Sequence, residues 1–176
     1  MKEKLVFKKT CSIHASDLHF ATVIFPYITK KIEENTTVRT ILERNEEENI
    51  EKVIKNVGLN SELKEKIRKI DWKESDIIKI RKKFKLLEED ILNKENINII
   101  VLGTNIFIKK VNRAIELWIK NNSKKVQEKE IEINVINCYS IEESKEMNKI
   151  INQYDYILKT SGLEEIITAE ELLKAN

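Results

Sequence analysis

Apolar residues recur along the chain with two alternating spacings, which predict strands and helices in turn. Short runs rich in β-branched residues are typical of strands, whereas apolar residues three and four positions apart are typical of one helix face. The first spacing predicts strands at 5–13, 38–42, 97–102 and 131–137, and a brief one at 70–72. The second predicts helices at 18–34, 46–57, 62–69, 77–91, 105–120, 140–154 and 163–173.

The strand expected at 97–102 decides the fold class. Its sequence, Ile-Asn-Ile-Ile-Val-Leu, is apolar at positions that point to both faces of a sheet. This is typical of a parallel sheet that helices cover on both sides. Strands that alternate with helices form right-handed crossover units. We therefore predict an α/β fold, a three-layer sandwich with a mostly parallel central sheet of about five strands and helices on both faces.

Nothing in the pattern divides the chain into smaller units. The 176 residues contain three glycines and one proline, with no internal repeat and no low-complexity segment. We therefore expect one α/β domain over 1–176, with a core at about 5–167 and a peripheral C-terminal helix at 163–176.

Charge and composition narrow the classes of partner. The 32 Lys and Arg against 30 Asp and Glu leave a formal net charge of +2, so nucleic acid is not an expected partner, because binding through bulk charge needs a larger excess. The longest nearly apolar stretch, 20–28, is half of the roughly 20 residues that span a bilayer, and no membrane association is expected. The first nine residues show no signal-peptide pattern. Cys11 and Cys138 lie in no CxxC motif, which favours a reduced, cytoplasmic protein.

A ligand site is expected where the strands end. In open parallel sheets, ligands bind beyond the carboxyl ends of the strands, and helix N-termini at that edge favour an anion. The segments that follow the predicted strands are 14–17, 43–45, 71–72, 103–105 and 138–140. The predicted ligand-binding residues are His14, Asp17, Glu43, Arg44, Gly103, Thr104, Asn105 and Tyr139.

Two of these segments have structural interpretations as well. His14 and His19, the only histidines, flank Asp17 and suit metal ligands or an acid–base pair, since imidazole titrates near neutral pH. A spacing of five does not place them on one helix face, however, and a cap formed by Asp17 beside a half-buried His19 explains the segment too. Gly103 fits a tight turn as well as the close approach of a ligand.

The motifs of common catalytic sites are absent. The chain contains no GxxxxGK[ST] phosphate loop, no GxGxxG dinucleotide fingerprint and no GxSxG nucleophile elbow. We therefore predict no catalytic residue, no metal and no cofactor. The densest basic run, at 79–85, suits a phosphate, but the acidic residues at 88–90 favour a solvated helix face.

Four features resemble MEDS domains, the sensor modules found in methanogens, methylotrophs and other bacteria. The first strand ends in Ile13-His14 and runs into Asp17, and a helix and a strand then lead to Glu43. A late strand ends in 137–139 (Asn-Cys-Tyr), and a closing segment follows at 156–160 (Tyr-Ile-Leu-Lys-Thr). The resemblance covers about 5–167 and implies a RecA-like fold without a phosphate loop. It also implies a non-catalytic, ligand-sensing or regulatory role.

Three functions follow from these observations. The first is a non-catalytic sensory or regulatory domain that binds a small organic molecule, with a pocket lined by His14, Glu43, Thr104 and Tyr139. The second is a protein–protein adaptor without a ligand, whose partner is a regulatory protein or a second copy of the chain. The third is a small enzyme with a scattered site, in which His14 or His19 is the base and Glu43 or Asp71 is the acid.

Overall fold

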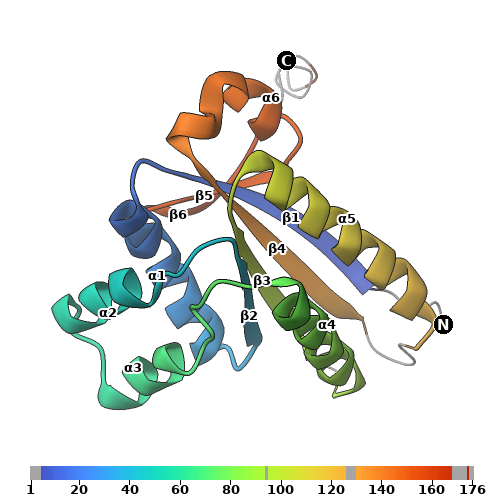
Figure 1. Cartoon of the computed structure of the whole chain (residues 1–176), viewed down its shortest axis with the longest axis horizontal. Coiled ribbons are helices and arrows are strands. Elements are labelled where there is room, and N and C mark those ends of the chain that lie inside the picture. Colours follow the sequence, from blue (N-terminus) through green and yellow to red (C-terminus); the bar gives the residue numbers. More distant parts are fainter. Residues whose placement is uncertain (1–4, 94, 126–129, 168–173, 175–176) are drawn as a thin grey trace.

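The computed structural model describes residues 5–93, 95–125, 130–167 and 174, and strands and helices alternate along it (Figure 1). The strands are β1 (Leu5–His14), β2 (Thr37–Leu42), β3 (Ile97–Leu102), β4 (Ile131–Ser140), β5 (Tyr156–Lys159) and β6 (Gly162–Glu165). The helices are α1 (Asp17–Glu33), α2 (Glu47–Asn56), α3 (Ser61–Arg68), α4 (Ile77–Leu92), α5 (Asn105–Asn122) and α6 (Met147–Ile151), with 3-10 turns at Ser123–Lys125 and Ile141–Glu146. Over the described ranges, no helix has both the length and the apolar character needed to cross a membrane.

The strands of the described ranges form one six-stranded sheet in the order β2-β3-β4-β1-β5-β6. Neighbouring strands are parallel except β5 and β6, which form an antiparallel hairpin. The chain leaves β1 towards β2 on one side and leaves β4 towards β5 on the other. The strand order therefore reverses between β1 and β4. In open α/β sheets, ligands bind at such a reversal, in the crevice above the carboxyl ends.

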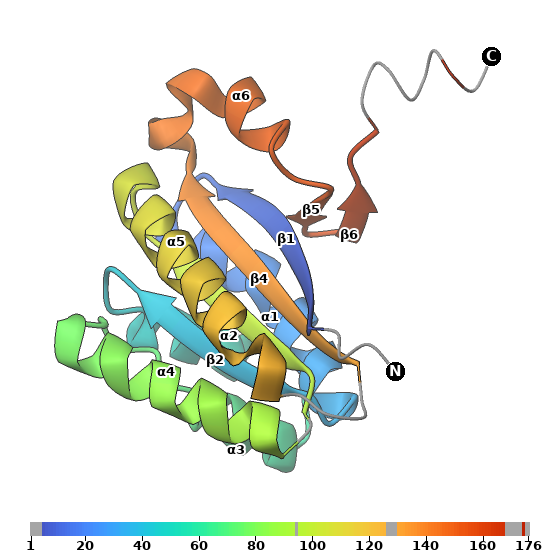
Figure 2. The ribbon, with the colours of Figure 1, turned by 90° about the vertical axis from the view of Figure 1, so that its right-hand side faces the viewer.

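Helices cover both faces of the sheet (Figure 2). On the face that we call the α1 face, α1, α2 and α3 pack against alternate strand residues such as Leu42, Ile100 and Ile136. On the opposite α5 face, α4, α5 and α6 pack against the intervening residues, such as Ile41 and Ile99. All of β3 is buried, as expected for a strand that is apolar on both sides. The α/β fold, the three-layer sandwich and the mostly parallel sheet are confirmed, with six strands where about five were predicted.

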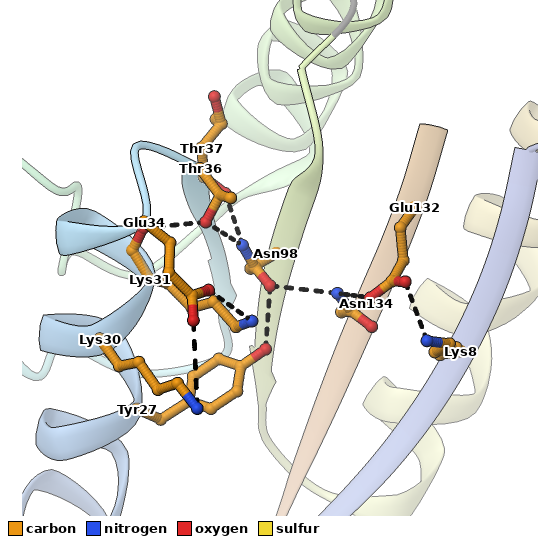
Figure 3. Close-up of polar contacts among 10 residues, drawn as sticks. All are labelled: Lys8, Tyr27, Lys30, Lys31, Glu34, Thr36, Thr37, Asn98, Glu132 and Asn134. Carbon is orange, nitrogen blue, oxygen red and sulfur yellow. Dashed lines mark hydrogen bonds and ion pairs between the residues drawn. The ribbon is translucent and has the colours of Figure 1, made fainter. Parts of the chain in front are cut away.

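A polar ladder crosses the amino-terminal half of the α1 face (Figure 3). Lys8 of β1 forms an ion pair with Glu132 at 2.8 Å, and Glu132 accepts a 2.8 Å hydrogen bond from Asn134. Asn134 donates to the buried Asn98 Oδ1, which also accepts a 2.9 Å hydrogen bond from the Tyr27 hydroxyl of α1. Because a buried polar group is costly unless it is paired, this chain of contacts ties α1 to β3, β4 and β1 in one position.

The brief strand predicted at 70–72 is wrong. The segment is a loop that lies beside the end of β2, where the Thr40 hydroxyl donates to the Asp71 carbonyl oxygen. The Trp72 indole is buried and donates to the Ile67 carbonyl at 2.9 Å. Side-chain hydrogen bonds therefore hold this apolar stretch in place of a strand ladder.

The prediction for the C-terminal segments also changes. The helix expected at 163–173 is wrong at its start, because Gly162–Glu165 is strand β6, paired with β5; residues 168–173 lie outside the described part. Gly162 has φ of 119°, a conformation that glycine adopts readily and that allows the tight hairpin. The helix expected at 140–154 is shorter, since β4 continues to Ser140 and a 3-10 turn precedes α6.

Candidate functional site

The carboxyl ends of four parallel strands meet at one edge of the sheet. Ile13 is in register with Tyr139, and Leu102 is in register with both Leu42 and Cys138. All eight predicted ligand-binding residues therefore lie along this edge, at the end of a strand or at the start of the helix that follows.

The two faces of the sheet divide these residues into separate groups. Successive side chains along a strand point to opposite faces of the sheet. The neighbours Glu43 and Arg44 therefore lie on different faces, Arg44 on the α1 face and Glu43 on the α5 face. His14 packs edge-on against the Phe20 ring of α1, at 5.6 Å between ring centroids, on the α1 face. Tyr139 belongs to the core of the α5 face. The pocket that was expected to join His14 with Glu43, Thr104 and Tyr139 is therefore split by the sheet.

On the α1 face, five side chains form what we call the Arg44 cluster: His14, Asp17, Arg44, Glu46 and Asn49. Arg44 Nη2 lies 3.1 Å from His14 Nε2 and 2.8 Å from Asp17 Oδ1. Its Nε donates to Glu46 Oε1 at 2.8 Å, and Asn49 donates to the other carboxylate oxygen at 3.0 Å. Only 1% of Glu46 and 2% of His14 is exposed. Arg44 thus contacts three of these side chains and Asn49 binds the second Glu46 oxygen, while His14 Nδ1 is buried without a hydrogen-bond partner among the described residues.

Burial sets the protonation of the Arg44 cluster. Burial, together with the nearby Arg44 cation, lowers the pKa of His14 from 6.5 to about 4. Burial also raises the pKa of Glu46, against the opposing hydrogen bonds from Arg44 and Asn49. A histidine that is neutral and already accepts a hydrogen bond from arginine is a poor general base, because the same nitrogen would have to take the substrate proton.

Glu43 and Gly103 meet above the start of α5. The Glu43 carboxylate accepts hydrogen bonds from the Thr104 backbone N–H at 2.5 Å and from its hydroxyl at 3.2 Å. The Thr104 hydroxyl in turn caps the helix by accepting from the Phe107 N–H. A Cβ atom at Gly103 would lie 2.6 Å from Glu43 Oε2 and from the Phe107 ring. Glycine is therefore required here by the close approach of the Glu43 and Phe107 side chains, and Glu43 stabilises the positive end of the helix.

On the α5 face, four other side chains form the Tyr–Asn cluster. Asn112 and Asn137 exchange two amide hydrogen bonds of 2.9 Å. Asn137 Nδ2 also donates to the Tyr154 hydroxyl at 2.9 Å, and that hydroxyl lies 2.5 Å from the hydroxyl of Tyr139. Burial raises the pKa of both tyrosines. The cluster is thus neutral, and it places two hydroxyls and two amides inside an otherwise apolar layer.

A hollow of about 380 Å³ lies beside the Tyr–Asn cluster, and we call it the α5 hollow. Tyr139, Tyr154 and Asn112 reach it from the buried side. The remaining lining residues are Lys9, Asn105, Ile108, Lys109, Arg113, Glu116 and Gln153. Three of the lining side chains are cations and one is a carboxylate. The hollow extends from β4 and β1 to α5 and to the segment after α6, and so lies on the α5 side of the strand reversal.

Of the eight predicted residues, Asn105 and Tyr139 line the α5 hollow. The other six lie in the Arg44 cluster or at the start of α5. Sequence reasoning missed Lys109, Arg113 and the Tyr–Asn cluster, although two signals were present. Asn112 interrupts the apolar stripe of α5, and Asn137 interrupts an apolar strand. A polar residue in a buried row indicates a paired network or a site.

The structure also bears on two other kinds of chemistry, metal binding and nucleophilic attack by a cysteine thiolate. Among the described residues, no group of three or more His, Cys, Asp or Glu side chains is arranged to hold a metal ion. Cys11 and Cys138 are free, buried thiols. Burial raises the pKa of Cys11 to about 11, and it raises the pKa of Cys138 as well. Neither thiol has the thiolate character of a nucleophile.

Comparison of the chain with models of known families, with curated proteins and with solved structures found no match.

Proposed function

We propose that this chain is a sensory or regulatory domain that binds a small organic anion in the α5 hollow. The observation that carries the proposal is the position of a buried, fully paired Tyr–Asn cluster at the inner wall of a hollow with a cationic rim. This hollow lies beside the β1–β4 strand reversal, the place where open α/β sheets bind ligands.

The size and chemistry of the hollow suit a small organic molecule. Its volume of about 380 Å³ falls in the range of roughly 300–1,000 Å³ typical of ligand pockets. Ile108 supplies apolar contact, while the hydroxyl of Tyr154 and the amides of Asn105 and Gln153 supply hydrogen-bonding groups. A ligand with a flat or apolar body and a few polar atoms would satisfy both.

The rim favours a negative charge. Lys109 and Arg113 are exposed on successive turns of α5 and form no ion pair within the described ranges. Lys9 is already paired with Glu116 at 3.0 Å. Two cations therefore remain for a carboxylate or phosphate group, and arginine can bind either one with two parallel hydrogen bonds.

Binding without chemistry is the better supported form of the proposal. The candidate base His14 and the candidate acid Glu43 are held in contacts within the protein on opposite faces of the sheet. A scattered His/Glu enzyme site therefore has less support than a binding site. The proposed role is also the one that the resemblance to MEDS domains implies. We place it in a reducing, cytoplasmic setting, which free buried cysteines suit.

A thermal-shift panel of small anions tests the proposal, with phosphate, citrate, benzoate and adenosine monophosphate as members. A ligand at about 100 times its Kd stabilises the folded state by about 2.7 kcal/mol, which for a chain of this length raises Tm by about 5–10 °C. The double variant Lys109→Gln/Arg113→Gln should fold normally and lose that shift.

The matched control changes two cations of the same helix that lie outside the hollow. Lys110 and Lys120 are exposed on α5 and do not line it, so Lys110→Gln/Lys120→Gln should keep the full shift. A panel in which no member raises the wild-type Tm contradicts the proposal, and so does a shift that both double variants retain.

A further inference from the structure

A second hollow lies at one end of the sheet, along the free side of edge strand β2. It has a volume of about 450 Å³, and we call it the β2 groove. Val38 and Thr40 of β2 form its floor. One wall comes from α3 and the residues after it, on the α1 face, and the other comes from α4 on the α5 face. The groove shares no lining residue with the α5 hollow.

The backbone of β2 presents unused hydrogen-bonding groups to this groove. Thr37 donates its N–H to Asn96, and Glu43 donates its N–H to Leu102, so the odd-numbered residues face β3. Leu42 faces the free side, where its N–H donates to the Ser75 hydroxyl and its C=O accepts from the Ser75 N–H. By the alternation of a strand, Val38 and Thr40 also face the free side. Their N–H and C=O groups have no partner within the part of the chain that the structure describes.

Ser75 occupies the free side of β2 at Leu42. Its backbone N–H donates to the Leu42 carbonyl oxygen, while its side-chain hydroxyl accepts from the Leu42 N–H. Val38 is half-buried and only 2% of Thr40 is exposed, so a docked segment reaches Val38 directly and reaches Thr40 once the residues that cover it move. Buried backbone groups are almost always paired, and an extended segment seated in this way would pair both residues.

Lysines line both walls of the β2 groove. Lys66 and Lys69 lie on the α3 side, and Lys79 and Lys82 lie on α4. Lys66 is paired with Glu62, and the Lys79 ammonium donates to a carbonyl oxygen. Lys69 and Lys82 are exposed, with no ion pair to any described residue. The two walls thus each offer an uncompensated cation.

Deeper in the groove, two further cations hold its shape. Arg39 forms a two-point ion pair with Asp90 at 2.7 and 2.9 Å. Lys83 is 7% exposed and contacts the Ser75 hydroxyl at 2.8 Å and Asp71 at 3.1 Å. These pairs hold α4 and the loop at 71–75 against β2, so the recess is built into the fold.

We propose that the β2 groove binds an extended acidic peptide segment of a partner protein, which adds a strand beside β2. Backbone pairing to Val38 and Thr40 supplies affinity that is independent of sequence. Side chains of the added strand alternate between the two walls, so acidic residues at successive positions meet lysines of α3 and α4 in turn.

An acidic peptide fits better than the other occupants of such an edge. A second copy would bring its own lysine-lined β2 edge against this one, and like charges repel. A nucleic acid would match the lysines, but its backbone offers no N–H and C=O groups spaced as in a strand. The lysines thus exclude neutral or basic strands and admit an acidic one.

The test uses a fluorescein-labelled peptide of about eight residues in which pairs of successive glutamates alternate with pairs of valines, so that both faces of the added strand carry glutamate. Binding is followed by fluorescence anisotropy. Two analogues separate the contributions. One has lysine in place of glutamate. The other keeps every charge but carries N-methyl groups at alternate residues, which removes the backbone donors. Both analogues should bind at least about tenfold more weakly than the parent peptide.

Two variants of the protein locate the binding. Val38→Pro removes a donor that faces the groove and is tolerated on an edge strand; it should weaken binding about tenfold. Lys69→Glu/Lys82→Glu should abolish binding, whereas Lys110→Glu/Lys120→Glu on α5 should leave it unchanged. If Val38→Pro does not fold, the charge-reversal pair and the N-methyl analogue still decide the outcome.

Several results would overturn the proposal. They are equal binding of the N-methylated and parent peptides, no binding of the parent up to about 1 mM, or full binding by the Lys69/Lys82 variant. Displacement by single-stranded DNA with higher affinity than the peptide would assign the groove to nucleic acid. A dimer in sedimentation that Val38→Pro dissolves would assign it to a second copy. None of these readouts depends on the α5 hollow.

Discussion

The two faces of one sheet edge each gather polar side chains and use them differently. On the α1 face, Arg44 pairs with His14, Asp17 and Glu46, of which His14 and Glu46 are buried. On the α5 face, the Tyr–Asn cluster is also paired, but Tyr139 and Tyr154 reach an open hollow.

This difference separates a structural cluster from a candidate site. A buried charged group that a neighbouring cation satisfies has little left to offer a ligand, and its main effect is on stability. Neutral hydroxyls and amides that border a hollow can hydrogen-bond to water when no ligand is present. A ligand atom can then replace that water at small cost in free energy. Changes on the α1 face should therefore alter stability, and changes on the α5 face should alter binding.

The largest effect is expected for Arg44→Met. This change leaves the buried Glu46 carboxylate without its cation, and breaking a buried pair costs about 4 kcal/mol. Urea denaturation at neutral pH measures it. Arg113→Met, the same change at an exposed arginine of the α5 hollow, should alter stability by less than about 0.5 kcal/mol while it weakens anion binding. Equal losses of stability in the two variants would remove the distinction between the faces.

The second-largest effect is expected on the pH dependence of the free energy of unfolding, and His14 is its cause. The unfolded histidine binds a proton near pH 6.5 and the folded one only near pH 4. Between these values the unfolded state holds more protons, so stability is present above pH 6.5 and is lost as the pH falls through this window. The loss is up to about 3 kcal/mol.

The variant His14→Gln tests this sign. The free energy of unfolding at several pH values between 7 and 4 should fall less steeply in His14→Gln than in the wild type. His19→Gln keeps His14 and should keep the steeper fall. The same slope in the wild type and His14→Gln would show that His14 is not the buried neutral group.

A smaller loss of stability is expected from a change at the start of α5, the helix that lines the α5 hollow. Gly103→Ala would place a methyl group 2.6 Å from Glu43 Oε2 and the Phe107 ring, and overpacking of this kind costs about 2 kcal/mol. Gly58→Ala is the matched control, because no atom lies within 4 Å of the new Cβ. Calorimetry should show a lower Tm for Gly103→Ala alone. A normal Tm would mean that Glu43 moves away from Gly103 without cost.

The smallest change in stability is expected for Tyr154→Phe. The hydroxyl accepts from Asn137 and contacts Tyr139, but it lines the hollow, so water can replace it and the loss should be about 1 kcal/mol. Anion binding should weaken about tenfold. Tyr156→Phe removes a hydroxyl with no hydrogen bond among the described contacts and should leave binding unchanged. A large loss of stability with unchanged binding would place Tyr154 in the core and not in the site.

The main strands could be predicted because their apolar patterns are local. β3 is buried on both faces, and the run of its sequence, apolar except for Asn98, shows this directly. β5 and β6 could not be predicted in the same way. Each has four residues, and β5 pairs with β1 at only two positions. Their strand conformation depends on partners far away in the sequence.

The edge that holds the candidate site was predictable, whereas the grouping of its side chains was not. A strand end identifies Glu43 and Arg44, but a shift of one residue in register exchanges the faces to which they point. The hollow joins Lys9 of β1 with Lys109 and Arg113 of α5. That grouping follows only once α5 is packed across the sheet.

The most direct measurement of the central claim is NMR chemical-shift mapping with the panel anion that stabilises the protein most. The account predicts that amide shifts concentrate at Asn105, Asn112, Arg113, Tyr139 and Tyr154. Shifts that concentrate instead at His14, Asp17 and Arg44 would contradict it, because the ligand would then occupy the face that the account describes as closed.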